Sequence, residues 1–380
     1  MIAGRRVRVL ALSPIPEEGA GCRFRIAQYV PRLREAGFDV TIRAFYTPAF
    51  FRFVYRHGHY ARKLTMFLGL VVRRLTQLLE LGRYDLVFLY REAIPIGPPL
   101  VEWIVAARGI PIVYDFDDAI FLPAVSDANK AISFLKYPGR VAQILRRSRQ
   151  VVVGNEFLAA YARTRNAAVT VIPTAVDTTR FVPRDAPPHE DPSRELVVGW
   201  IGSPTTFPYL QQLAEVLRTV AARRPFTLKV SGAGTPVTFP GLKVLEVPWS
   251  LADEVNLFNT CDIGVYPLTD DEWAKGKCGF KAIQFMACGV PVVVAAVGVN
   301  REIVSDGENG FLAATPAEWM EKLERLLTDP ALRARFAAAG RRTIEARYSL
   351  DVTAPRLAGV LALALEQARP STSAAAEERS

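Results

Sequence analysis

Residues suited to metal and redox chemistry are scarce in this sequence. Its 380 residues include only four cysteines and three histidines. The cysteines, at positions 22, 261, 278 and 288, have no metal-ligand spacing. We therefore expect free thiols in a reducing compartment, the cytoplasm, and neither a bound metal ion nor another cofactor.

Long apolar runs and two common phosphate-binding motifs are missing as well. No stretch reaches the ~20 uncharged apolar residues that a membrane-spanning helix needs. The apolar run near the start is short and contains Arg8, so we interpret it as a β-strand rather than a signal peptide. A Walker A motif and a GxGxxG after the first strand are both absent, which argues against a P-loop NTPase and a simple NAD-dependent dehydrogenase.

Negative charge is scarce in the first half of the chain. Residues 1–190 hold 27 of the 47 Lys and Arg but only 16 of the 38 Asp and Glu. Within this half, residues 45–83 combine aromatic and aliphatic side chains with arginines, and Glu80 is their only acidic residue. We expect this segment to contact an anionic membrane surface; the alternative is a helix packed on the first domain with a solvated basic face. Without an RNA- or DNA-binding motif, we expect no nucleic-acid partner.

What the sequence has in abundance is alternation between short apolar runs and amphipathic helical stretches. Six strand-like runs, from VRVLALS to VTVIP, precede a stretch rich in Pro and Asp, and five more, from ELVVGWIG to PVVVAAVG, follow it. Near-continuous apolar strands separated by helices predict parallel sheets covered on both faces. We predict an α/β chain of two Rossmann-like domains; one large sheet is the alternative.

The predicted boundaries follow from this pattern. The first domain takes residues 1–180, a linker takes residues 181–194, and the second domain takes residues 195–350. A C-terminal helix takes residues 351–369, and the small polar residues 370–380 form a disordered tail.

Three glycine-containing loops follow predicted strands, where helix N-termini would offer amides to an anion. The first two loops, PIPEEGAGCRFRI and WIGSPTT, contain the candidate residues Gly19, Gly21, Arg25, Gly202, Ser203 and Thr205. The alternatives are a plain turn for the first loop and ordinary helix capping for the second.

The third loop, GKCGFKAIQ at residues 276–284, carries the clearest phosphate chemistry. Gly276 and Gly279 leave room for a pyrophosphate against the backbone, and Lys277 and Lys281 supply positive charge at a predicted helix start. Two solvated lysines are the alternative. We predict a diphosphate site at this loop.

A cluster of aspartates follows another predicted strand, in YDFDDAIF. The cluster contains a D-x-D pattern and consists of Asp115, Asp117 and Asp118. Three roles for it are open: binding a divalent metal ion, contacting an acceptor, and capping a helix. We predict no metal and name Asp117 and Asp118 as candidates for a general base. Asn155 and Glu156, after a later strand, are open to a similar role or to capping.

The run from Gly276 to Gly310, with FMACGVPVVVAAVGVNREIVSDGENGF, resembles the donor-binding core of family 4 retaining glycosyltransferases of the GT-B fold. The resemblance covers residues 5–365. The chain is similar in particular to a bacterial subgroup of the family with GKCGFK-type and WIGSP-type loops. It implies two Rossmann-like domains facing across a cleft, with the C-terminal helix returning to the first. It also implies that the second domain holds the donor. We expect Cys278, Phe280 and Glu302 to contact the donor as well.

The chain departs from the family at one pattern. In the family this helix carries E-x7-E, whose first Glu holds the donor sugar and whose second holds the ribose. Aligning on MACG places Gly276 and Gln284 at those positions. Gln284 can still bond a ribose, whereas Gly276 has no side chain to offer. The candidate substitutes lie upstream, at Asp270, Asp271 and Glu272.

These features predict an enzyme that moves a sugar from a UDP- or GDP-sugar to the hydroxyl of a glycan, lipid-linked or small-molecule acceptor. The resemblance implies retention and a place in polysaccharide or glycoconjugate biosynthesis. Lys277, Lys281, Arg25 and the Gly202–Ser203 amides are expected to stabilise the departing diphosphate. Two alternatives remain: a sugar-nucleotide epimerase of the same fold, which the few histidines disfavour, and a catalytically silent nucleotide-sugar-binding protein, which the missing glutamates favour.

Overall fold

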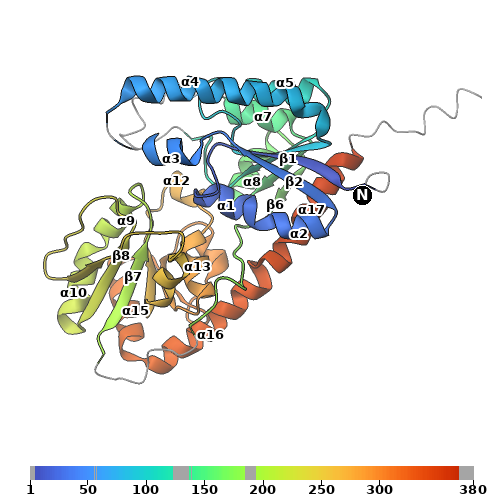
Figure 1. Ribbon diagram of the computed structural model, residues 1–380. Helices are drawn as coiled ribbons and strands as arrows, with labels where there is room; N and C mark the ends of the chain where they lie inside the picture. The colour runs from blue at the N-terminus through green and yellow to red at the C-terminus, as the bar shows by residue number, and fades with distance from the viewer. Residues whose placement is uncertain are drawn as a thin grey trace, which may run out of the picture. The chain divides into compact units, whose positions relative to one another are not determined.

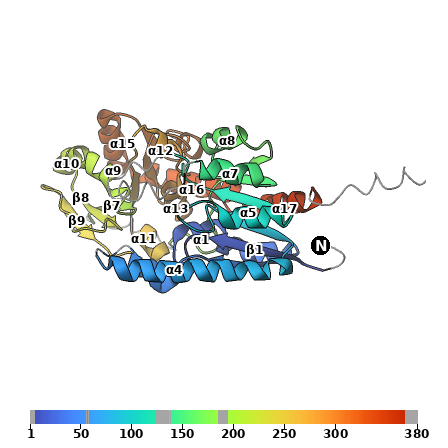
Figure 2. The same ribbon diagram turned by 90° about the horizontal axis from the view of Figure 1, so that it is seen from above.

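The chain forms two compact units, each built on one sheet (Figures 1 and 2). The computed structural model describes residues 5–54, 56, 58–122, 137, 139–184 and 194–367. The first unit takes Met1–Pro173 and Thr353–Ser380, and the second takes Thr174–Val352. The prediction of two Rossmann-like sheets is confirmed, and the alternative of one large sheet is wrong. Residues 370–380 and 185–193, which hold the predicted tail and most of the predicted linker, lie outside the described residues.

The first unit has a six-stranded sheet in the order β2-β1-β3-β4-β5-β6, with parallel pairing throughout. Its strands are β1 (Val7–Ser13), β2 (Phe38–Ala44), β3 (Leu86–Tyr90), β4 (Ile112–Phe116), β5 (Gln150–Val153) and β6 (Val169–Val171). Strands β3, β4 and β5 are buried along their whole length, as near-continuous apolar runs predict for a sheet covered on both faces.

Helices cover both faces of this sheet. They are α1 (Ala20–Arg25), α2 (Val30–Glu35), α3 (Pro48–Val54), α4 (Tyr60–Gln77), α5 (Leu100–Ala107), α7 (Arg140–Arg147) and α8 (Glu156–Arg163), with 3-10 turns η1 (Ala27–Tyr29) and η2 (Leu78–Arg83). In Figure 1, α4, α5 and α7 lie over one face, and α1 and α2 lie over the other.

The C-terminal helix α17 (Leu350–Glu366) joins the first unit, as predicted. The Tyr29 hydroxyl donates to Thr353 Oγ1 at 3.1 Å, and Gln150 Nε2 donates to Gln367 Oε1 at 3.1 Å. The two ends of the described chain therefore contribute to the same core.

The second unit repeats the plan with a sheet in the order β12-β11-β10-β7-β8-β9, again parallel. Its strands are β7 (Leu196–Ile201), β8 (Phe226–Ser231), β9 (Lys243–Glu246), β10 (Ile263–Tyr266), β11 (Val292–Ala295) and β12 (Phe311–Ala313). Its helices are α9 (Phe207–Gln212), α10 (Ala214–Arg223), α11 (Glu254–Asn259), α12 (Glu272–Lys275), α13 (Phe280–Ala287), α14 (Asn300–Ile303), α15 (Pro316–Thr328) and α16 (Pro330–Arg347). Among the strands that the structure describes, the three-residue β12 was not expected from the sequence.

Close contact between β10 and α13 depends on a glycine. A Cβ at Gly264 would lie 2.6 Å from Phe285 Cγ, and the Phe285 ring is itself packed edge-on against Phe258 at 4.9 Å. The absence of a side chain on β10 thus lets α13 lie directly on the sheet. In the described parts of both units, no helix is long and apolar enough to cross a membrane.

We predict that Gly264→Ala destabilises the protein by about 1–3 kcal/mol, because the new methyl group overpacks the fully buried Phe285 ring. Urea unfolding followed by circular dichroism measures the change. Gly359→Ala is the control, because open space surrounds Gly359 on α17, where alanine gains up to about 1 kcal/mol over glycine. Equal midpoints for Gly264→Ala and the wild type would contradict the packing argument.

Candidate functional site

The predicted diphosphate loop lies at the position where open α/β sheets bind ligands. In the second unit the strand order reverses between the adjacent strands β7 and β10. Ligands of such sheets bind outside the carboxyl ends of the strands at this switch point. The loop with Ser203 follows β7, and the loop leading to Lys277 follows β10. The topology therefore places two of the three predicted loops together.

Two lysines flank the start of α13. Lys277 Nζ lies 5.7 Å from the centroid of the Trp273 ring. Lys281 Nζ lies 5.4 Å and 5.6 Å from the Phe258 and Phe280 rings and donates to Gln284 Oε1 at 2.8 Å. Both lysines are half-buried. The amides and the dipole at the start of α13, between the two lysines in the sequence, also favour an anion.

The glycines of this loop serve the packing of the loop itself. Gly279 caps α13 with φ 64°, and a Cβ there would lie 2.2 Å from Ile303 Cδ1 and 3.2 Å from Asn300 Oδ1. A Cβ at Gly298 would lie 3.1 Å from the Cα of Lys275. The loops after β10 and β11 are therefore locked together, and Cys278 is buried between helices α12 and α13 along the chain.

The WIGSPTT loop presents hydroxyls rather than free amides. The Gly202 amide donates to the Ser231 carbonyl at 3.0 Å, and the Ser203 amide donates to Thr206 Oγ1 at 2.9 Å. Ser203 Oγ lies 2.9 Å from Thr205 Oγ1. Because both amides are already bonded, the Gly202–Ser203 amides are not open to a phosphate in this conformation. The predicted anion contact of this loop is therefore limited to its hydroxyl groups.

Most of the residues predicted to contact the donor sugar and the ribose are buried or bonded to other protein groups. Gln284 is fully buried; its oxygen is bonded to Lys281 and its Nε2 has no hydrogen-bond partner. Asp271 caps α12 by accepting from the Ala274 amide at 2.8 Å. Lys275 forms ion pairs with the two neighbouring acids, Asp270 at 3.4 Å and Glu272 at 3.3 Å. Glu302 is exposed on α14.

In the first unit, Arg25 is a structural residue in this conformation. Its Nη2 lies 2.5 Å from Asp115 Oδ2, its Nε donates to Asp115 Oδ1 at 2.9 Å, and its Nη1 donates to the Ile172 carbonyl at 2.9 Å. The guanidinium is 2% exposed. Burial lowers the pKa of Arg25, but the charge and hydrogen bonds of Asp115 outweigh burial and raise that pKa above its usual value. Arg25 thus joins α1 to the sheet and offers no open face to a phosphate.

Gly19 and Gly21 also face protein atoms. A Cβ at Gly19 would lie 2.6 Å from Ile15 Cδ1, and one at Gly21 would lie 2.2 Å from the hydroxyl of Tyr90. Gly21 is therefore required by the phenol of Tyr90, which ends β3. The helix α1 that follows is only six residues long.

Asp117 and Asp118 meet Tyr90 and Arg91, two residues that were not predicted. Arg91 Nη2 lies 2.8 Å from Asp117 Oδ1 and 2.5 Å from Asp118 Oδ2, and the Tyr90 hydroxyl donates to Asp117 Oδ1 at 2.8 Å. Burial raises the pKa of Asp117, but the charges of Arg91 and Arg25 and hydrogen bonds from Arg91 and Tyr90 outweigh it, so the pKa lies below its usual value. In the described residues, no group of three potential ligands could hold a metal ion.

Asn155 serves as a helix cap, which is one of the two roles that the sequence left open for it. Its side chain accepts from the Leu158 amide at 2.9 Å at the start of α8. Glu156 forms an ion pair with Arg163 on the same helix at 2.7 Å.

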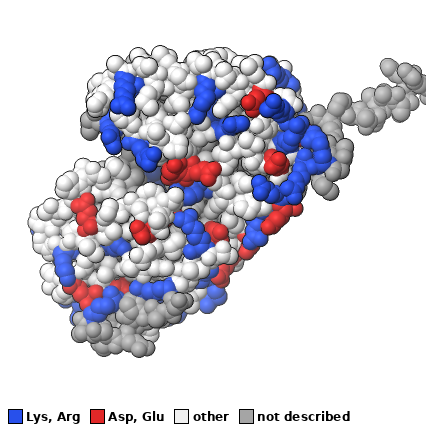
Figure 3. All heavy atoms as spheres, in the orientation of Figure 1, with Lys and Arg blue, Asp and Glu red and all other residues white. Residues whose placement is uncertain are grey.

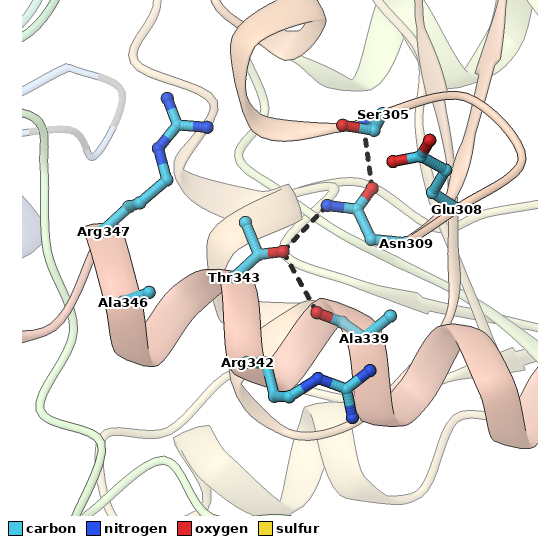
Figure 4. Close-up of a pocket in the computed structure, with 8 residues that line it drawn as sticks. All are labelled: Ser305, Glu308, Asn309, Ala339, Arg342, Thr343, Ala346 and Arg347. Atoms are coloured by element: carbon cyan, nitrogen blue, oxygen red, sulfur yellow. Dashed lines mark hydrogen bonds between the residues drawn. The ribbon is translucent and has the colours of Figure 1, made fainter.

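A pocket of about 380 Å³ lies elsewhere in the second unit, between α16 and the loop at residues 305–309 (Figure 4). Asn309 links the two: it accepts from the Ser305 amide at 2.8 Å and donates to Thr343 Oγ1 at 3.0 Å. Arg342 and Arg347 point in different directions in Figure 4, so they do not converge on one ligand. None of the predicted site residues lines this pocket.

Comparison with known sequences finds a family model within the second unit and a set of similar proteins. A family model described as glycosyl transferases group 1 matches residues 195–329. The D-inositol 3-phosphate glycosyltransferase of Stackebrandtia nassauensis is 30% identical over 231 residues, 52% of this chain and 49% of the relative. The protein of the same name from Xylanimonas cellulosilytica is 41% identical over 95 residues, 24% of this chain and 22% of the relative. The matched regions thus span about half or less of these relatives.

Comparison with solved structures covers nearly the whole chain. Sucrose-phosphate synthase from Thermosynechococcus elongatus matches with a TM-score of 0.66 and 17% identity, over 96% of this chain and 100% of the other. Anabaena HepE in complex with UDP and glucose matches with a TM-score of 0.65 and 17% identity, over 94% and 100%. The likeness at this identity is one of fold, and the predicted GT-B fold is confirmed.

We predict that Arg25→Met costs about 3–5 kcal/mol of stability, because it leaves the Asp115 carboxylate buried and unpaired. The double variant Arg25→Met/Asp115→Leu recovers part of this loss. Urea unfolding measures stability, and calorimetric titration measures the affinity of the double variant for UDP and GDP, which we expect to match the wild type. A stable double variant with lost nucleotide affinity would instead identify Arg25 as a phosphate ligand.

Proposed function

We propose that the protein is a retaining glycosyltransferase of family 4 that transfers a sugar from a UDP- or GDP-sugar to an acceptor hydroxyl in glycoconjugate or polysaccharide assembly. One observation carries the proposal: Lys277 and Lys281 flank the N-terminus of α13 at the switch point of a sheet that matches the group 1 glycosyltransferase model. The bound UDP and glucose named for HepE support a nucleotide-sugar donor.

The chemistry of the leaving group explains the cations. As the bond between the anomeric carbon and the diphosphate breaks, its electron pair stays on the diphosphate oxygen. Positive charge and helix amides aimed at that oxygen stabilise the transition state more than the ground state. Lys277, Lys281 and the dipole of α13 supply this field, and the hydroxyls of Ser203 and Thr205 supply hydrogen bonds from the neighbouring loop.

The aromatic contacts of the lysines support the same role. The rings of Phe258 and Phe280 limit the directions in which Lys281 can move, and the Gln284 oxygen holds its ammonium group. An ammonium held in advance loses less entropy on binding an anion than a solvated one does. Gln284 accordingly takes a positioning role for Lys281, in place of the ribose contact suggested by the family pattern.

The acceptor is assigned to the first unit, where a carboxylate of Asp117 or Asp118 takes the proton of the attacking hydroxyl.

A silent nucleotide-sugar-binding protein is the second candidate, because Gly276 and the buried Gln284 stand in place of the family's two glutamates. Release of UDP or GDP from a panel of nucleotide sugars separates the two: an enzyme hydrolyses at least one donor slowly, whereas a silent protein binds without turnover.

We predict that Lys281→Ala weakens the binding of UDP or GDP at least about tenfold, equivalent to about 1.4 kcal/mol, and leaves uridine or guanosine binding almost unchanged. The reason is that the ammonium acts on the diphosphate and not on the nucleoside. Isothermal titration calorimetry with the diphosphate and the nucleoside gives both affinities.

Lys275→Ala is the matched control for this experiment. It removes the same charge from the neighbouring helix α12, where Lys275 is paired with Asp270 and Glu272. We expect wild-type affinities for both ligands. Equal losses for diphosphate and nucleoside in Lys281→Ala would contradict the phosphate assignment.

The helix α4 supports the further proposal of a peripheral membrane contact. Leu64, Leu68, Val72 and Leu79 are 60%, 55%, 61% and 80% exposed, and their spacing of four to seven residues places them along one side of α4 and the following turn. A continuous apolar stripe of this kind is uncommon on a surface that meets only water. Basic and uncharged atoms cover most of the surface along α4 in Figure 3.

Not every basic residue of the segment is available to lipid. Arg74 is 1% exposed and donates to backbone carbonyls of Ala93 and Arg43, and Arg73 donates to the Ala44 carbonyl. Burial lowers the pKa of Arg74 to about 9. The exposed basic residues include Arg52, Arg56 and Arg62, before and at the start of α4, and Arg83 after it. These residues and the apolar stripe make up the proposed membrane contact.

We predict that Leu64→Glu/Leu68→Glu reduces flotation with phosphatidylglycerol vesicles at least about tenfold, because it places two acids in the apolar stripe. Leu363→Glu on α17, where Leu363 is 47% exposed, is the control and should float like the wild type. Wild-type binding should also weaken at high salt and with neutral phosphatidylcholine vesicles. Equal flotation of all three proteins would refute the contact.

A further inference from the structure

A further cavity of the second unit lies at the amino end of its strands, away from the predicted donor loops. Its volume is about 340 Å³, at the small end of the ~300–1,000 Å³ that ligand pockets span. Asp262 lines it just before β10, and Pro291 lines it just before β11. The loops with Ser203 and Lys277 instead follow the carboxyl ends of β7 and β10. The cavity is therefore separate from the proposed diphosphate site.

Most of the lining of this cavity is uncharged. The uncharged side chains include Cys261, Cys288, Val290, Pro291, Ala334 and Ala337. The alanines lie on α16, which packs directly on α13 one turn further along, where a Cβ at Gly340 would be 3.5 Å from Met286 Cβ. Alanine side chains are too short to fill the space beside that contact. A cavity with such a lining favours an apolar group over water.

The charges at the cavity are largely balanced within the protein. They belong to Arg184, Arg333, Arg341 and Asp262. The Asp262 side chain is 5% exposed and pairs with Arg184 at 3.1 Å and with Arg194 at 2.6 Å. Arg341 pairs with Glu345 on the same helix at 2.6 Å. These pairs leave the charge of Arg333 to be accounted for.

Arg333 is half-buried and lacks an ion pair with any carboxylate that the structure describes. Its Nη1 donates to the carbonyls of Leu326 and Leu327 at 2.6 Å and 3.3 Å, near the end of α15. Burial lowers the pKa of Arg333, and the charges of Asp262 and Asp329 offset burial only in part. A cation in this situation gains from an incoming anion. Arg333 also lies near the N-terminus of α16, where the helix dipole favours negative charge.

From this volume, lining and charge we infer that the cavity is a second ligand site, which takes a small monocarboxylate with an apolar body. The carboxylate accepts from Nε and Nη2 of Arg333, because Nη1 is already bonded. One cation without a partner balances a single negative charge, which favours a carboxylate over a doubly charged phosphate. The apolar body lies against the alanines of α16. At the ~30 Å³ that a water molecule takes in the liquid, the cavity has room for about ten non-hydrogen atoms.

Octanoate tests this inference on the full-length protein, since its size suits the cavity and it carries a single negative charge. Acetate has the same charge without the apolar body, and octan-1-ol has the apolar body without the charge. Titrations followed by saturation-transfer NMR give the three dissociation constants. We expect octanoate to bind at least about tenfold more tightly than either of the other two. Excess UDP or GDP should not displace it, because the donor loops lie at the opposite end of the strands.

Two substitutions separate the contributions of charge and space. Arg333→Met keeps an apolar stem without the charge, so it should weaken octanoate binding at least about tenfold and leave octan-1-ol binding unchanged. Ala337→Leu fills the cavity and should weaken the binding of both ligands. Ala338→Leu fills the same cavity from an exposed position and replaces Ala337→Leu if thermal unfolding shows that the latter does not fold.

Arg342→Met is the matched control, because Arg342 is exposed on the same helix but lines the other pocket (Figure 4). It should bind octanoate like the wild type. The inference is overturned if octanoate binds no more tightly than acetate or octan-1-ol, if UDP displaces it, if Arg333→Met keeps wild-type affinity, or if Arg342→Met loses as much. None of the lining residues is a predicted donor contact, so these outcomes leave the donor-hydrolysis test of the proposed function untouched.

Discussion

Parallel pairing brings the carboxyl ends of all six strands of a sheet to one edge, and the candidate chemistry of both units depends on this constraint. In the second unit it places the loops after β7 and β10 side by side, with Ser203 on one and Lys277 on the other. In the first unit it brings Arg91, after β3, to the aspartates after β4. Residues far apart in the sequence thereby act together.

Charge serves different purposes at the two edges. Arg25 and Arg74 are buried and bonded to internal acceptors, so they stabilise the first unit and are unavailable to a ligand. Lys277 and Lys281 are half-buried and rest on aromatic rings. In the proposed function, the charges of Lys277 and Lys281 act on the diphosphate, whereas the charge of Arg25 stabilises the buried carboxylate of Asp115.

Glycine has a similar double use in the chain. At Gly21, Gly264 and Gly279 the missing side chain makes room for a tyrosine, a phenylalanine and an isoleucine of the protein itself. These contacts draw helices and loops close to the sheet edge, and they set the positions of Tyr90 and of the start of α13. A glycine in a loop after a strand is consistent with phosphate binding, but close packing of the protein uses the same property.

The sequence by itself determined the fold class, because near-continuous β-branched runs separated by helical stretches can be buried only in parallel sheets covered on both faces. All eleven expected strands are present, and among the strands of the described residues β12, three residues that follow Gly310, was not expected. The family-like pattern and the lysines at α13 also drew attention to the sheet edge on which the proposed function rests. These signals are local in the chain, so they are visible without a structure.

Tertiary structure alone decided which polar groups are open. The buried pairing of Arg25 with Asp115, the bonded amides of Gly202 and Ser203, and the burial of Gln284 arise from contacts between distant segments. Arg91 was missed for the same reason: its importance lies in a left-handed backbone and in aspartates 26 and 27 residues away. Local residue patterns carry no information on such long-range hydrogen bonds, and these bonds determine which side chains remain available for chemistry.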